Sequence, residues 1–152
     1  MSKKVLKVYL ASGWFTEVQK KLMEEIYEVL TFRADVELFA PFYNGIVLKP
    51  DAPREEWKKV FELDVNMIGE CDLMVANIED FEPGTIFETG VAYKSNVPVI
   101  AYSSVKGRGL NLMLAQSCIG FANSRDELRN HVDTFVKDPT IERINRWEGE
   151  PI

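Results

Sequence analysis

The chain has 152 residues, a formal net charge of −6 and 46% hydrophobic residues, as expected for one globular domain. An acidic chain without a block of Lys and Arg is not expected to bind nucleic acid or an anionic membrane surface. No apolar run approaches the length of a membrane span, so we expect a cytoplasmic protein that acts on small molecules.

Short apolar runs alternate along the chain with segments of helical periodicity. Strands are expected at residues 5–10, 36–40, 73–78, 97–102 and 119–122. Helices are expected at residues 16–30, at 54–70, from the Pro83-Gly84 turn to near Asn96, at 110–116 and at 124–137. Residues 42–53 and 103–109 contain turn-forming residues and are expected to be loops, and the tail at 138–152 has no clear periodicity.

This alternation predicts βαβ units and therefore a parallel sheet. We expect residues 1–152 to form a single doubly wound α/β domain, with a five-stranded parallel sheet in flavodoxin-like order. Ligands of such sheets bind beyond the carboxyl ends of the strands. The functional site is therefore expected at that edge.

Glu88 follows one of these strand ends and is predicted to lie in the first turn of a helix. Free backbone N–H groups and the helix dipole would there favour its ionised form, as a nucleophile requires. Thr85-x-x-Glu88 also fits a capping box, which needs no function. The two interpretations do not exclude each other.

Asp64 lies inside the apolar stripe of the helix at residues 54–70, together with Trp57, Phe61 and Ile68. A carboxylate in such a stripe must have a partner or face a cleft, because burying it unpaired is costly. To reach the site, this helix would have to overhang the sheet.

This chain lacks the residues that several common kinds of functional site require. Cys71 and Cys118 have no metal-ligand spacing and are expected to be buried free thiols, and the single His131 excludes a site of clustered histidines. The loop after the first strand matches neither phosphate-binding glycine motif, so we expect no metal and no cofactor. Carboxylates with aromatic residues instead suit glycosyl transfer on a neutral compound of a sugar and a base.

Four segments in order along the chain resemble the nucleoside 2-deoxyribosyltransferase family. They are Tyr9-Leu10-Ala11-Ser12-Gly13-Trp14-Phe15, Asp64-x-x-x-Ile68-x-x-Cys71-Asp72, Pro83-Gly84-Thr85-x-Phe87-Glu88-x-Gly90-x-Ala92 and Asn111-Leu112-Met113. The resemblance implies a doubly wound α/β fold. It also implies transfer of a 2-deoxyribosyl group between nucleobases, with retained configuration, through a covalent intermediate on the glutamate.

The same resemblance implies roles for the matching residues. Glu88 would be the nucleophile, and Tyr9 would orient its carboxylate. Asp64 and Glu82 would contact the base and assist its protonation. The substrate-binding residues would be Gly13, Trp14, Phe15, Gly84, Asn111 and Met113. Of these, the first three would line the base pocket, whereas Asn111 and Met113 would reach the site of a neighbouring subunit in a dimer-based homo-oligomer such as a hexamer.

This chain departs from the family pattern at two places. The family commonly has Asp where Glu82 stands, which leaves Asp80 as a second candidate for that acid. The tail ends in Ile152, where an aromatic residue of some members makes a contact, so no role is assigned to Ile152.

Two other functions remain open from the sequence. One is hydrolysis of the N-glycosidic bond of deoxynucleoside monophosphates, with Lys106 and Arg108 as the cations for the phosphate. The other is a non-catalytic domain that binds nucleosides.

Overall fold

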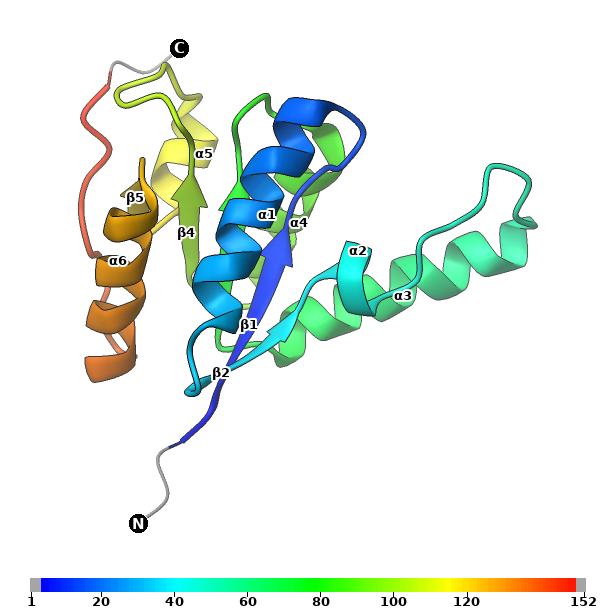
Figure 1. Cartoon of the computed structure of the whole chain (residues 1–152), viewed down its shortest axis with the longest axis horizontal. Helices are drawn as coiled ribbons and strands as arrows, with labels where there is room; N and C mark the ends of the chain where they lie inside the picture. Colours follow the sequence, from blue (N-terminus) through cyan, green and yellow to red (C-terminus); the bar gives the residue numbers. More distant parts are fainter. Residues whose placement is uncertain (1–3, 150–152) are drawn as a thin grey trace.

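The computed structural model describes residues 4–149, which form one parallel sheet with helices on both faces (Figure 1). The strand order is β2-β1-β3-β4-β5, and each neighbouring pair is parallel. The strands are β1 (Leu6–Ala11), β2 (Val36–Phe39), β3 (Leu73–Asn77), β4 (Val99–Tyr102) and β5 (Gly120–Ala122). The predicted doubly wound domain with five strands in flavodoxin-like order is therefore confirmed.

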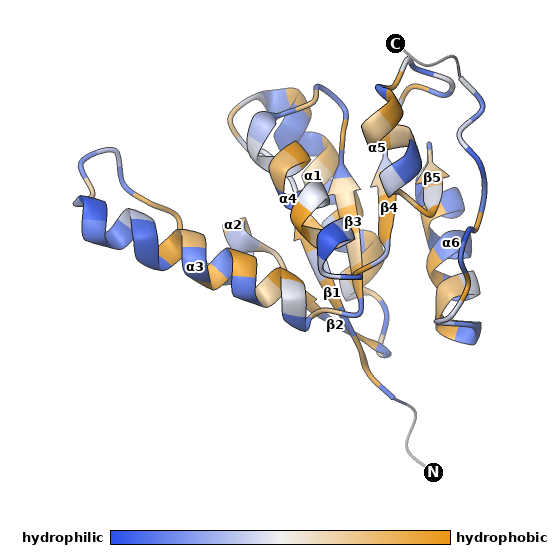
Figure 2. Ribbon diagram, turned by 180° about the vertical axis from the view of Figure 1, so that it is seen from behind, coloured by the Kyte–Doolittle hydropathy of each residue, from blue (hydrophilic) through white to orange (hydrophobic). Residues whose placement is uncertain are grey.

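The helices are α1 (Glu17–Thr31), α2 (Pro41–Asn44), α3 (Arg54–Glu70), α4 (Pro83–Lys94), α5 (Leu112–Ser117) and α6 (Arg125–Lys137). Hydrophobic residues colour most of the sheet in Figure 2, as expected for strands covered on both faces. Among residues 4–149, no helix combines the length and apolarity that crossing a bilayer requires.

Alternating residues of β1 belong to two separate hydrophobic cores. Val8 and Leu10 pack with side chains of α1 and α6, whereas Tyr9 and Ala11 pack with side chains of α3, α4 and α5. This follows from the two-residue period of a strand. Tyr9 is thus directed to the face that carries Asp64 and Glu88.

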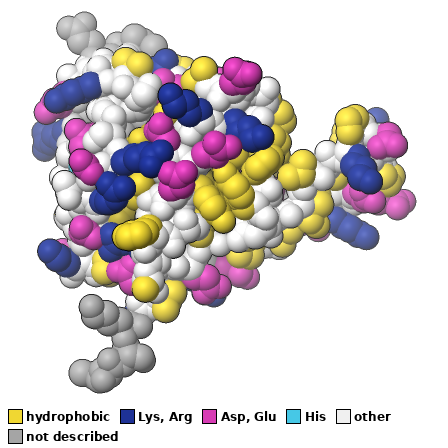
Figure 3. All heavy atoms as spheres, in the orientation of Figure 1, with side chains coloured by type: hydrophobic (Ala, Val, Ile, Leu, Met, Phe, Trp, Pro, Cys, Tyr) yellow, Lys and Arg dark blue, Asp and Glu magenta, His cyan; other side chains and the backbone are white. Residues whose placement is uncertain are grey.

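Helix α3 and the loop before it project from the body of the domain (Figures 1 and 3). Its only buried residue is Ile68, close to the C-terminal end of the helix, and Trp57 and Phe61 are exposed. The N-terminal half of the helix thus extends past the body of the domain (Figure 1). Asp64 lies between the projecting half and the buried end.

Two local predictions were wrong. Residues 41–44 form the short helix α2 inside the expected loop, because Pro41 occupies its first turn and the Asn44 side chain accepts a hydrogen bond from the Ala40 N–H at 2.6 Å. Helix α4 begins at Pro83, so Glu88 is its sixth residue and lies in the second turn. The first-turn position predicted for Glu88 is therefore corrected.

The tail runs along the outer edge of β5. The Asn145 side chain accepts from the Phe121 N–H at 2.7 Å and donates to the Phe121 carbonyl at 3.0 Å. Trp147 packs on the second core and donates to the Arg108 carbonyl at 3.1 Å. Ile152 lies outside the described residues.

Candidate active site

A hydrogen bond between Tyr9 and Glu88 forms the centre of the site. The Tyr9 ring is fully buried in β1, and its hydroxyl donates to Oε2 of Glu88, which reaches back from α4. Burial raises the pKa of Glu88 to about 7, with the Tyr9 hydrogen bond opposing the rise and the charges of Asp64 and Glu82 adding to it. Burial and the charge of Glu88 also raise the pKa of Tyr9, so its hydroxyl keeps the proton it donates.

The direction of the Glu88 pKa differs from the sequence-based expectation. The helix dipole was expected to favour the ionised carboxylate, but its influence decreases within the first turn. Glu88 lies one turn further along the helix, where burial has the larger effect. Its carboxyl group consequently titrates close to neutral pH.

Asp64 is the second acid of the site. Its Oδ1 atom is buried and has no hydrogen-bond partner among the described residues, and burial raises the pKa of its carboxyl group to about 6. Its charge also raises the pKa values of Tyr9 and Glu88, so Asp64 lies within electrostatic range of that pair. A buried acid without a partner is costly, which favours a role towards a ligand.

Glu82 caps the N-terminus of α4. Its Oε1 accepts from the Gly84 N–H at 2.9 Å, and its Oε2 accepts from the Thr85 N–H and hydroxyl at 2.8 and 2.9 Å. Thr85 is therefore the third helical residue and not the cap, so the expected capping box of Thr85 and Glu88 is wrong. Gly84 contributes a backbone N–H to this cap.

The loop after β1 brings its backbone against Glu82. A Cβ atom on Gly13 would lie 2.6 Å from Oε1 of Gln19 and 2.7 Å from Cγ of Glu82, so a larger residue would require one or both of these side chains to move. Trp14 is half-buried beside the Phe42 ring, at 5.5 Å between centroids, and Phe15 is 72% exposed. The predicted base-pocket loop thus adjoins one of the predicted acids.

Within one chain, Asn111 and Met113 lie on the other side of α4 from Glu88. Asn111 caps α5 by accepting from the Met113 N–H at 2.8 Å, and both residues line an open apolar cavity of about 690 Å³. The cavity also contacts Ile86 and Tyr93 of α4. Because helix positions advance by about 100° per residue, Glu88 lies on nearly the opposite side of α4 from Ile86.

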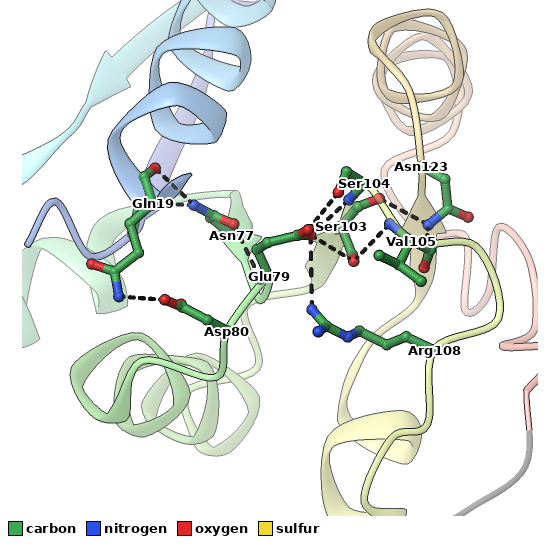
Figure 4. A network of polar contacts seen from close by, with 10 residues as sticks. Gln19, Asn77, Glu79, Asp80, Ser103, Ser104, Val105, Arg108 and Asn123 are labelled. Carbon is green, nitrogen blue, oxygen red and sulfur yellow. Dashed lines mark hydrogen bonds and ion pairs between the residues drawn. The ribbon is translucent and has the colours of Figure 1, made fainter. Parts of the chain in front are cut away.

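A polar network that the sequence analysis did not identify surrounds the acidic loop at residues 77–82 (Figure 4). On one side, the buried Gln19 donates to Oδ2 of Asp80 at 2.7 Å. On the other, Glu79 accepts from the Ser103 hydroxyl at 2.8 Å, the Ser104 N–H at 2.7 Å and the Ser104 hydroxyl. The Thr16-x-x-Gln19 spacing predicts a capping box at the start of α1, but it does not indicate the contact with Asp80.

The Glu79 carboxylate also lies 3.8 Å from the Arg108 guanidinium. Hydrogen bonds from Ser104 and Ser103 and the charge of Arg108 outweigh burial and lower the pKa of Glu79. The negative charge of Glu79 is therefore stabilised by groups of the protein itself. Within residues 4–149, no group of three or more His, Cys, Asp or Glu side chains is arranged to hold a metal ion.

Solved structures of similar fold include several nucleoside-processing enzymes. A 2-deoxyribosyltransferase from Bacillus psychrosaccharolyticus is 27% identical, with a TM-score of 0.76 over 86% of this chain and 95% of that chain. A 2-deoxyribosyltransferase from Leishmania mexicana is 19% identical, with a TM-score of 0.63 over 88% and 98% of the two chains. A CMP N-glycosidase from Clostridium botulinum is 22% identical, with a TM-score of 0.56 over 84% and 98%.

A comparison with curated proteins finds no match. The sequence profile of the nucleoside 2-deoxyribosyltransferases matches residues 8–135, which include every predicted site residue from Tyr9 to Met113. Both buried free cysteines expected from the sequence are also confirmed. The chain belongs to the nucleoside 2-deoxyribosyltransferase family.

Proposed function

We propose that this protein exchanges the nucleobase of 2′-deoxynucleosides, with retained configuration, through a covalent intermediate on Glu88. The observation that carries the proposal is the Tyr9–Glu88 hydrogen bond next to the unpartnered acid Asp64. Burial raises the pKa of Asp64 to about 6 and that of Glu88 to about 7, and the charge of Asp64 adds to the rise at Glu88, so states with one carboxyl group ionised and the other protonated are populated near neutral pH. Nucleophilic glycosyl transfer needs one group of each kind.

In the first half-reaction, a carboxylate oxygen of Glu88 attacks the anomeric carbon of the sugar. The glycosidic C–N bond breaks, and its electron pair moves to the base nitrogen or into the ring of the base. The base takes a proton from Asp64, whose raised pKa leaves a protonated fraction at neutral pH. Tyr9 directs the attack by holding the other oxygen of Glu88.

In the second half-reaction, a nitrogen of the incoming base attacks the anomeric carbon of the glycosyl ester. The ester C–O bond breaks and restores the Glu88 carboxylate, while the base gives its proton back to Asp64. Two inversions give overall retention. The 2-deoxy sugar suits this simple site, because no electron-withdrawing 2-hydroxyl opposes positive charge at the anomeric carbon.

In this proposal, Glu82 binds the base but does not protonate it. Both of its oxygens accept hydrogen bonds at the start of α4. Its side chain adjoins Gly13 of the base loop, so it contacts the base as a hydrogen-bond acceptor. Asp80, the other candidate for the acid that contacts the base, instead accepts a hydrogen bond from Gln19.

We also propose that the protein works in the cytoplasm as a homo-oligomer with shared sites. Tyr93 is 63% exposed and Met113 76% exposed around the apolar cavity, and Leu112 is exposed beside them. Apolar surface of this kind favours a protein partner. A second subunit covering it would bring Asn111 and Met113 to a site that lacks them in one chain.

Incubation with deoxythymidine and adenine tests the activity. The expected products are deoxyadenosine and thymine, and absence of exchange across a panel of purine and pyrimidine pairs would exclude the proposal. Release of base from deoxynucleoside monophosphates without an acceptor would instead favour the hydrolase. Arg108, one of the two cations expected for the phosphate, already lies near Glu79 and stacks on the Phe81 ring.

A further inference from the structure

Two loops of the site meet at Gln19, whose side chain is buried and 6% exposed. Its Oε1 accepts from the Phe15 N–H at 2.9 Å, in the predicted base loop. Its Nε2 donates to Oδ2 of Asp80, in the acidic loop that ends at Glu82. Its backbone carbonyl accepts from Nδ2 of Asn77 at 3.2 Å, where that loop leaves β3.

The acidic loop is held in a conformation that it would not adopt freely. Phe81 has a φ of +54°, in the left-handed region that is uncommon for residues with a side chain. Such a conformation persists where the surrounding contacts determine it. Gln19 holds the loop through Asp80 on one side, and Ser103 and Ser104 hold it through Glu79 on the other (Figure 4).

The space around Gly13 connects the two loops directly. Oε1 of Gln19 and Cγ of Glu82 would both lie within 2.7 Å of a Cβ on Gly13. A rotation of the Gln19 side chain would break its hydrogen bonds with the Phe15 N–H and with Asp80, which join the two loops. The amide is a suitable link, because one end accepts from the base loop while the other donates to the acidic loop.

We infer that Gln19 is a positioning residue, which sets the spacing between the base loop at residues 13–15 and the acid Glu82. This inference rests on the proposed function, because it assumes that the base binds between these two segments. Gln19 acts through its neighbours and does not take part in the attack at the sugar. Its loss should therefore weaken use of the base more than the chemistry at Glu88.

A purely structural role would be capping of α1. Thr16 and Gln19 form a capping box, in which Oγ1 of Thr16 accepts from the Gln19 N–H at 3.1 Å. Thr16→Ala removes that part of the cap and leaves the contacts of Gln19 with Phe15 and Asp80 in place. It is therefore the control for helix capping alone.

The experiment compares Gln19→Glu, Asp80→Asn and the double variant at pH 8. Gln19→Glu places two carboxylates opposite each other, whereas the double variant reverses the hydrogen bond and keeps the net charge of the wild type. We expect Gln19→Glu to raise the KM for the acceptor base about ten-fold, since a hydrogen bond to a charged group is lost, with a smaller change in kcat. Asp80→Asn should have little effect, and the double variant should return the KM close to that of the wild type.

Hydrogen exchange at residues 12–16 and 78–82 gives a readout that does not depend on turnover. Exchange should be faster in both segments of Gln19→Glu and return to the wild-type rate in the double variant. A double variant no better than Gln19→Glu, or an equal KM change in Thr16→Ala, would overturn the inference. If the wild type lacked activity while the exchange pattern held, the link between the loops would stand and the proposed function would fail.

Discussion

Replacing Tyr9 by Phe removes one hydroxyl from the centre of the site and leaves the buried ring in place. The lost hydrogen bond is the contact that opposes the rise in the pKa of Glu88. A hydrogen bond to a charged group contributes about 1.5–3 kcal/mol, which corresponds to roughly one to two pH units. The pKa of Glu88, now about 7, should rise by that amount.

The expected effect on activity follows from the ionised fraction of Glu88. At pH 7 this fraction should fall from about half to roughly 1–10%, so kcat/KM should fall about five- to fifty-fold. The loss should shrink as the pH rises to about 9, where at least about half of the carboxylate is ionised in the variant. The assay is the pH dependence of kcat/KM for release of base from a deoxynucleoside.

Tyr102→Phe is the matched control for this variant. Tyr102 is also buried in a strand, and its hydroxyl donates to Oε2 of Glu25 at 3.1 Å, but it packs in the other hydrophobic core. Its removal should leave the acidic limb of the pH profile unchanged. If Tyr9→Phe lowered the rate equally at all pH values, the account of Tyr9 as the group that lowers the pKa of Glu88 would be refuted.

Three further variants test other parts of the site. Glu88→Gln should abolish turnover and raise the free energy of unfolding at pH 8 by about 3 kcal/mol, but not at pH 4. The raised pKa of Glu88 favours the protonated acid, so the wild type loses stability as the pH rises from about 4.5 to about 7. Thermal unfolding at the two pH values measures this, and destabilisation at pH 8 would contradict it. Glu82→Ser keeps a good N-cap residue and should keep the free energy of unfolding of the wild type, whereas Glu82→Ala should lower it by about 1 kcal/mol in chemical denaturation. Both variants should lower kcat/KM about ten-fold if the carboxylate contacts the base. Met113→Asp should dissociate the oligomer in light scattering and reduce activity, whereas the control Phe32→Asp, at an even more exposed residue, should do neither. An intact oligomer in Met113→Asp would show that the apolar cavity is not part of the interface.

Much of the fold could be predicted because most elements have a strong local signal. The β-branched and aromatic residues of β1 and the apolar runs of β3 and β4 indicate strands by themselves. The start of α4 was predicted less well, because Glu82 is an uncommon capping residue and Thr85 is a common one. The sequence analysis placed the cap at Thr85, three residues after the actual cap Glu82. It therefore predicted Glu88 in the first turn of α4, whereas the structure has it in the second.

The site itself depended on contacts between distant residues. The resemblance to the family indicated the pairing of Tyr9 and Glu88, which are 79 residues apart, and the structure contains it. The pKa of Glu88 could not be predicted, because its burial depends on how α3 and α4 pack over the sheet. Gln19 was missed for a similar reason, since Asp80 is 61 residues away and no local pattern indicates the contact.

The most direct test of the account is mass spectrometry of the protein after mixing with a 2-fluorinated deoxynucleoside, which slows breakdown of a glycosyl ester. The account predicts a mass increase equal to the fluorinated sugar, located on the peptide that contains Glu88 and absent in Glu88→Gln. Release of base without any adduct, or an adduct on another residue, would contradict Glu88 as the nucleophile.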